Sequence, residues 1–111
     1  MQDEVENIYV SDEVMKYIVE LVNKTRSHDN ISLGSSPRGS IALINMAKAN
    51  AYLHERDYVI PQDVKEVFYD VMNHRILLKD VKRGSENRMK HDILNSIKFK
   101  TNTPGIGKYD K

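Results

Sequence analysis

The sequence of 111 residues contains no cysteine and no tryptophan, and its longest hydrophobic run is the four-residue segment 41–44. The lack of cysteine excludes a disulfide-bonded secreted scaffold, a thiolate metal site and a thiol nucleophile. Four apolar residues fall far short of the roughly 20 that a membrane-spanning helix needs. Three of the first six residues are acidic, which is unlike a signal or transit peptide. A cytoplasmic protein without a membrane segment is the expectation.

The near-neutral charge, 17 Lys and Arg against 16 Asp and Glu, hides an asymmetry along the chain. Residues 1–78 carry 8 basic and 12 acidic side chains, whereas residues 79–111 carry 9 basic and 4 acidic ones. A hydrophobic content of 40% is ordinary for a soluble domain of this length. The sequence therefore predicts one acidic folded body followed by a basic extension.

Hydrophobic spacing predicts a first amphipathic helix over about residues 12–26, with Ser11 as its N-cap. Its core-facing stripe consists of Val14, Tyr17, Ile18, Leu21 and Val22. The following segment is rich in turn formers, and Ile31 and Leu33 are placed to form a short extended piece.

A second helix is predicted from Pro37 to about Leu53, with Ser36 as its N-cap and the proline at its first position. Apolar residues occupy almost every face of this helix. This pattern is typical of a central helix with neighbours on several sides.

A third helix is predicted to start at Pro61, with His74 and Arg75 as its cationic last turn, and a fourth helix to cover residues 86–98. The predicted fold class is all-α, a small bundle of three to four helices with very short extended segments. Residues 1–10 are interpreted as a flexible lead-in and 11–78 as the helical bundle. Residues 79–111 are interpreted as a basic C-terminal extension that ends in a mobile tail.

No self-contained active site or metal site is recognisable. The four histidines (His28, His54, His74 and His91) lack ligand-type partners at helical spacing, so they are interpreted as exposed or capping side chains. The segment Gly105-Ile106-Gly107 has no following helix and is interpreted as part of the tail.

Arg38 stands out because a cation is disfavoured in the first turn of a helix, where the dipole is already positive. The same terminus presents unpaired N–H groups that bind anions, and the planar guanidinium could complete such a site. The alternative is an ion pair between Arg38 and a local carboxylate such as Asp29. The residues alone favour neither the anion site nor the ion pair.

The segments 31–43 (ISLGSSPRGSIAL) and 56–64 (RDYVIPQDV), followed by His74-Arg75, resemble the C-terminal lid subdomain of MoxR-family AAA+ ATPases. The segments 9–14 and 24–26 resemble the start of that lid. The resemblance covers about residues 8–78 in register. Where the family more often has Thr or Ser before the proline of the third helix, this chain has Ile60, which cannot cap with its side chain.

The resemblance implies that Arg38 is the sensor-2 arginine, which senses the γ-phosphate of ATP, and that Ser35, Ser36 and Pro37 shape the helix start that aims it. It also implies ATP and magnesium as cofactors of the full-length protein, with none bound to this chain alone. The implied partners are an N-terminal nucleotide-binding subdomain, a homo-oligomeric ring of subunits and a client protein of a chaperone-like complex.

The sequence has no Gly-x-x-x-x-Gly-Lys-[Ser/Thr] phosphate loop and no apolar strand ending in Asp-Glu. We therefore expect the chain to be a lid excised from a longer ATPase and to hydrolyse no ATP by itself.

The alternative function is a free-standing module that binds nucleic acid or a protein through the basic segment (Lys79, Lys82, Arg83, Arg88, Lys90, Lys98 and Lys100). The acidic body and the lack of a helix face suited to base edges weigh against nucleic acid. A solvated helix face is the favoured interpretation of these charges.

Overall fold

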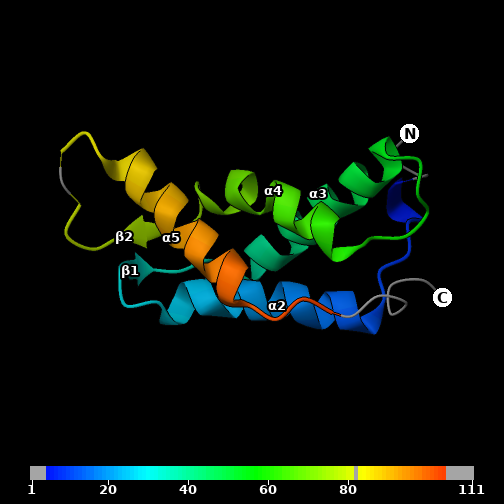
Figure 1. Cartoon of the computed structure of the whole chain (residues 1–111), viewed down its shortest axis with the longest axis horizontal. Coiled ribbons are helices and arrows are strands. Elements are labelled where there is room, and N and C mark those ends of the chain that lie inside the picture. Colours follow the sequence, from blue (N-terminus) through cyan, green and yellow to red (C-terminus); the bar gives the residue numbers. More distant parts are fainter. Residues whose placement is uncertain (1–4, 82, 105–111) are drawn as a thin grey trace.

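The computed structural model describes residues 5–81 and 83–104. Four helices account for most of this part: α2 (Asp12–Ser27), α3 (Pro37–Leu53), α4 (Pro61–Met72) and α5 (Glu86–Lys100). Two short strands, β1 (Ile31–Leu33) and β2 (Leu77–Leu78), pair antiparallel (Figure 1). The predicted all-α bundle with very short extended segments is confirmed.

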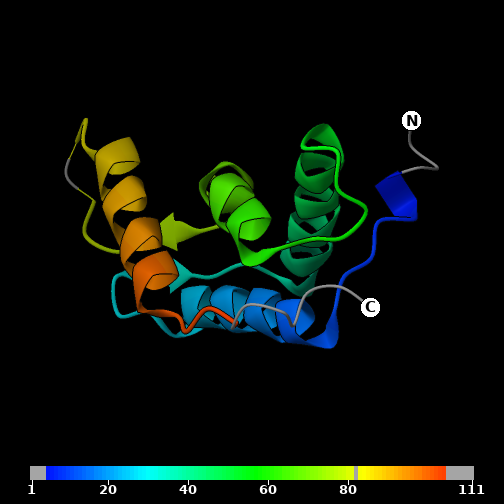
Figure 2. The same ribbon diagram turned by 45° about the vertical axis from the view of Figure 1, so that its right-hand side comes forward.

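The helices form two layers, with α2 along one side and α3, α4 and α5 standing on it in a row (Figure 2). The middle helix of the row is α4, which packs against α3, α5 and α2. The prediction that helix 37–53 is central is therefore wrong, because α3 lies at the end of the row.

The core lies between the two layers and is filled by the predicted stripe of α2 together with residues from every other helix. It also takes in Ile8 from the lead-in and Ile31 from β1. Its largest fully buried side chains include Tyr17, Phe68, Ile18, Leu21, Leu43, Met72 and Leu94.

Helix α5 belongs to this same core. Ile93, Leu94 and Ile97 are buried, and α5 packs against both α2 and α4. The boundary predicted at Leu78 therefore cuts through one hydrophobic core, because the apolar side of α5 packs into that core although the segment as a whole is basic. Of the predicted tail, residues 105–111 lie outside the described residues.

The lead-in also contributes to the body. The Tyr9 N–H donates to the Asp57 carbonyl oxygen (2.8 Å), and the Val59 N–H donates to the Tyr9 carbonyl oxygen (2.8 Å). Residues 8–10 are thus tied to the α3–α4 connection, while residues 1–4 lie outside the described part.

Helix α4 ends at Met72, so His74 and Arg75 lie beyond its last turn rather than within it, contrary to the prediction. The cation at this helix end is supplied by α5 instead. The Lys90 ammonium donates to the carbonyl oxygen of Asn73, the C-cap of α4, over 2.6 Å.

Within the described residues, no helix combines the length and the hydropathy needed to cross a membrane.

Candidate functional site at the start of α3

The loop before α3 is fixed to the last turn of α2. The Ser35 N–H donates to the Thr25 hydroxyl oxygen (3.1 Å), and that hydroxyl donates to the Val22 carbonyl oxygen (2.6 Å). Both Thr25 and Ser35 are buried. The start of α3 is therefore anchored through its backbone rather than through exposed side chains.

Two glycines permit this close packing. A Cβ at Gly34 would lie 2.5 Å from the Arg26 Cα and 2.6 Å from the Thr25 carbonyl oxygen. A Cβ at Gly39 would lie 1.8 Å from the Ser35 hydroxyl oxygen. Gly34 excludes larger residues because the added atom would meet fixed backbone, whereas at Gly39 the Ser35 hydroxyl would have to move.

Arg38 is the second residue of α3, after Ser36 at the N-cap and Pro37 at the first position. Ser36 occupies the predicted N-cap position, but its side chain makes no capping hydrogen bond. The Arg38 side chain is exposed. Within residues 5–81 and 83–104 it pairs with no carboxylate, so the alternative ion pair with Asp29 does not form.

A cleft of about 600 Å³ lies against this loop. Among the described residues, its lining includes two arginines, one histidine and no carboxylate: Arg26, Ser32, Leu33, Gly34, Ser35, Ser36, His74 and Arg75. The basic groups come from the end of α2 and from the turn after α4. A cleft with this lining beside a helix N-terminus is suited to an anion.

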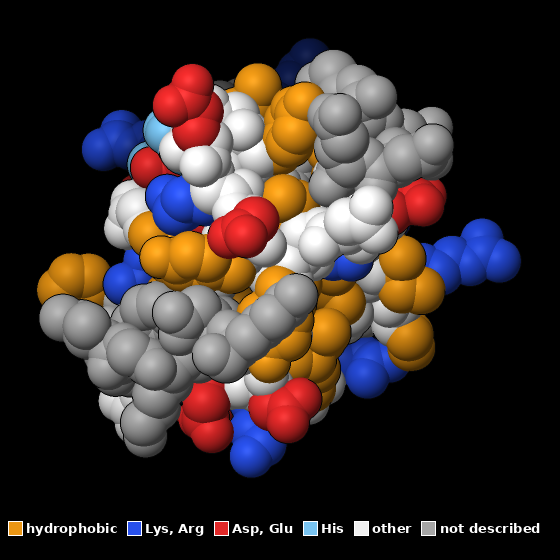
Figure 3. Space-filling model, turned by 90° about the vertical axis from the view of Figure 1, so that its right-hand side faces the viewer, with side chains coloured by type: hydrophobic (Ala, Val, Ile, Leu, Met, Phe, Trp, Pro, Cys, Tyr) orange, Lys and Arg blue, Asp and Glu red, His pale blue; other side chains and the backbone are white. Residues whose placement is uncertain are grey.

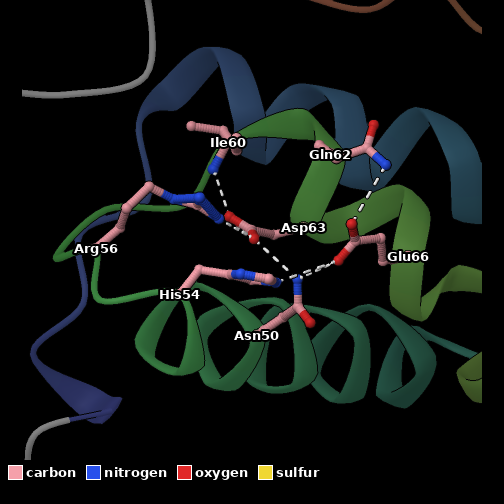
Figure 4. Close-up of polar contacts among 7 residues, drawn as sticks. All are labelled: Asn50, His54, Arg56, Ile60, Gln62, Asp63 and Glu66. Carbon is pink, nitrogen blue, oxygen red and sulfur yellow. Dashed lines mark hydrogen bonds and ion pairs between the residues drawn. The ribbon is translucent and has the colours of Figure 1, made fainter.

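A second polar cluster, which the sequence did not reveal as a unit, joins the end of α3 to the start of α4 (Figure 4). The buried Asp63 carboxylate accepts from the Arg56 guanidinium, from the Asn50 amide (2.9 Å) and from the Ile60 N–H (2.9 Å). Asp63 thus caps the backbone that Ile60 cannot cap with its own side chain. The only sequence signal was an acidic residue three positions after Ile60.

Glu66 forms the exposed edge of this cluster. Hydrogen bonds from the Asn50 and Gln62 side chains hold the pKa of the Glu66 carboxyl below its usual range, and the charges of His54 and Arg56 add to this effect. In the core, burial raises the pKa of the Tyr17 phenol. Neither group lines the cleft at the start of α3, so these shifts belong to the folded framework.

The histidines are dispersed, as the sequence predicted. The His28 ring accepts from the Asn30 N–H (3.1 Å), His54 approaches Glu66 (3.7 Å), and His91 packs edge-on against Tyr69. No group of three or more potential metal ligands occurs among the described residues.

The basic segment partly faces the body. Besides Lys90, the Lys98 ammonium reaches the Lys65 carbonyl oxygen on α4 (3.4 Å). Lys79, Arg83, Arg88 and Lys100 are exposed, and Lys82 lies outside the described residues. Of the six basic residues of this segment that the structure describes, Lys90 and Lys98 thus hold α5 to α4.

The chain is similar to a known protein family and to several curated proteins. Residues 23–97 match the model of the AAA lid domain. The chain is 50% identical over 78 residues to the uncharacterized protein YeaC of Bacillus subtilis and 37% identical over 87 residues to the chaperone MoxR1 of Mycobacterium tuberculosis. Each alignment covers 70% of this chain, but only 24% and 23% of the respective relative.

Among solved structures, the chain resembles a "putative ATPase" from Cytophaga hutchinsonii, with a TM-score of 0.80 and 36% sequence identity. The match covers 93% of this chain and 34% of that chain. The chain therefore spans about a quarter of the curated relatives and a third of the solved structure.

Proposed function

The chain belongs to the AAA lid domain family, with MoxR proteins among its relatives, and from this premise we propose that Arg38 is a nucleotide-sensing residue. In this proposal the chain is the lid of a MoxR-type ATPase, and Arg38 acts as the sensor-2 arginine toward the γ-phosphate of ATP. The observation that carries the proposal is an exposed arginine in the first turn of α3 that has no carboxylate partner within residues 5–81 and 83–104.

The chemistry of this region fits a phosphate group. Arginine offers several donors in one plane, and the first N–H groups of a helix lack intrahelical partners. Arg26 and Arg75 on the neighbouring cleft add positive charge. In this proposal the nucleotide-binding part of the ATPase holds the magnesium ion, and the lid contributes basic groups.

The physical role of Arg38 follows from its position on a rigid element. Its guanidinium would donate hydrogen bonds to a γ-phosphate oxygen when the lid lies against the nucleotide. Loss of that contact after hydrolysis would release the lid. The lid would then rotate as one rigid unit, because Ser35 and Thr25 anchor α3 to α2. In a ring of subunits, this motion would couple nucleotide state to work on a client protein.

The test is Arg38→Ala in the complete ATPase. A hydrogen bond to a charged group contributes about 1.5–3 kcal/mol, so ATP turnover should fall about 10- to 100-fold. Arg38→Lys should restore turnover only partly, because it keeps the charge but loses the planar set of donors. The 111-residue chain alone should show no ATP hydrolysis.

The matched control is Arg88→Ala, which removes an exposed arginine from α5. This variant should turn over ATP at the unmodified rate. Circular dichroism of the chain carrying Arg38→Ala should show unchanged helix content. Turnover within twofold of the unmodified enzyme in a folded Arg38→Ala variant would remove the sensor role.

A further inference from the structure

The ribbon formed by β1 and β2 carries a pair of leucines on its outer side. Leu33 and Leu77 are partners in the antiparallel pairing, so their side chains lie next to each other. Leu33 is nevertheless 61% exposed and Leu77 55%. The core contact of the ribbon is made by Ile31 instead, which is buried. The leucine pair is therefore apolar surface that the core of this chain does not use.

The ribbon is held firmly to the body. Ile31 at its start is part of the shared core. The Ser32 hydroxyl donates to the Leu77 carbonyl oxygen (3.2 Å), and the Lys79 N–H donates to the Asn30 carbonyl oxygen (3.0 Å). A surface fixed in this way loses little conformational freedom when a partner binds.

The segment that contains β2 is basic. Residues 73–85 include four Lys and Arg and a single acidic residue, Asp80. Arg75, Lys79 and Arg83 are exposed, and their side chains form no ion pair within the part of the chain that the structure describes. These charges are available to a partner from outside the chain.

Apolar and basic groups meet beside the ribbon. Leu33, Arg26 and Arg75 all line the cleft at the start of α3, so the leucine pair borders two guanidinium groups. We call Leu33, Leu77, Arg75 and Lys79 the ribbon surface. Exposed apolar side chains with a basic rim are typical of an interaction surface.

The opposite end of the molecule differs in charge. The ribbon lies toward one end, and α3 finishes at the other (Figure 1). There the exposed Glu55 and Asp57 border the cleft that contains Leu53, whereas Arg56 in that cleft is bound to Asp63. In the view of this end, acidic side chains lie among hydrophobic ones (Figure 3). Of the two apolar surfaces, only the one at the ribbon is complementary to a negatively charged partner.

We propose that the ribbon surface binds an acidic segment of a partner protein, in which apolar side chains stand next to carboxylates. The apolar side chains cover Leu33 and Leu77, and the carboxylates accept hydrogen bonds from Arg75 and Lys79. Residues 73–85 contain no Phe, Tyr or Trp on which a base could stack, which favours a protein over a single-stranded nucleic acid. The ribbon surface does not include Arg38, so the proposal does not depend on the nucleotide-sensing role.

The test uses a fluorescein-labelled peptide in which two leucines alternate with two glutamates between Gly-Ser ends. The 111-residue chain is added to the peptide, and binding is followed by fluorescence anisotropy. We expect binding that weakens as the salt concentration rises, because salt screens exposed charges. Leu77→Ser should weaken binding about fivefold, because it removes apolar contact area. Lys79→Glu should weaken it about tenfold, because attraction becomes repulsion.

The matched controls lie away from the ribbon. Leu53→Ser changes another exposed leucine, at the far end of α3, and Lys16→Glu reverses another exposed lysine, on α2. Both variants should bind the peptide with unchanged affinity. Circular dichroism checks that every variant is folded, and Leu33→Ser provides a second test of the leucine pair.

Four results would overturn the proposal. The first is no binding of the peptide at about 1 mM chain. The second is equal binding of a peptide in which serines replace the leucines, because the chain would then recognise charge alone. The third is tighter binding of a single-stranded RNA oligonucleotide, which would assign the basic segment to nucleic acid. The fourth is self-association of the chain that Leu77→Ser abolishes, which would assign the ribbon surface to a second copy.

Discussion

Two arginines occupy opposite environments in this protein. Arg56 is largely buried and binds the Asp63 carboxylate, so its charge is neutralised within the fold. Arg38 is exposed and has no carboxylate partner among the described residues. The charge of an arginine paired within the fold is compensated there, whereas an exposed arginine at a helix N-terminus is available for an anion from outside the chain.

The first prediction at the residue scale concerns Asp63. Asp63→Ala removes a buried carboxylate that accepts from Arg56, Asn50 and the Ile60 N–H, and it leaves the guanidinium without its partner. We expect the free energy of unfolding to fall by about 3 kcal/mol or more, measured by urea denaturation with circular dichroism.

The matched control for Asp63→Ala is Glu66→Ala, which removes the exposed member of the same cluster. Its cost should stay below about 1 kcal/mol because exposed pairs are screened by water. The double variant Arg56→Ala/Asp63→Ala should cost less than the two single changes together. Equal costs for Asp63→Ala and Glu66→Ala would contradict the structural role of the buried carboxylate.

At the scale of the elements, helix starts were the most predictable features of the sequence. Ser11, Ser36 and the prolines at positions 37 and 61 stand at the expected helix starts. The hydrogen bonds at these starts were less predictable. Ser11 accepts from the Val14 N–H (3.2 Å), whereas Ser36 makes no such bond because the loop before α3 is held by Ser35 and Thr25 instead.

The two serine caps give a matched pair of variants. Ser11→Ala should reduce the free energy of unfolding by about 1 kcal/mol, because it removes a formed cap bond. Ser36→Ala removes no such bond, so its cost should be less than about 0.5 kcal/mol. Thermal denaturation of both variants measures the difference, and a larger loss for Ser36→Ala would show that its hydroxyl caps α3 in solution.

At the scale of the whole molecule, α5 and the lead-in complete one core with α2, α3 and α4. This arrangement assigns residues 86–100 to the lid, in agreement with the family match, which continues to residue 97. It also leaves α3 at an end of the row, in contact with α4 and α2.

The shared core predicts one cooperative unfolding transition that depends on α5. Leu94→Ala on α5 should cost about 2–5 kcal/mol and lower the melting temperature of the whole chain, because Leu94 is only 1% exposed. Phe99→Ala on the same helix is the control. Its side chain is 92% exposed, so its cost should lie within about 0.5 kcal/mol. A Leu94→Ala chain that melts at the unmodified temperature would mean that α5 does not share the core.

By itself, the sequence determined the helices, the short strand at 31–33 and the place of Arg38 in the first turn of α3, because hydrophobic period and capping residues act within a few positions of the chain. The family resemblance could be stated from the order of the same motifs. Only the tertiary structure decided that α4 rather than α3 is central, that α5 enters the core and that Asp63 binds Arg56 and Asn50. These features depend on which apolar faces meet across distant segments of the chain, which the order of residues along each helix does not fix.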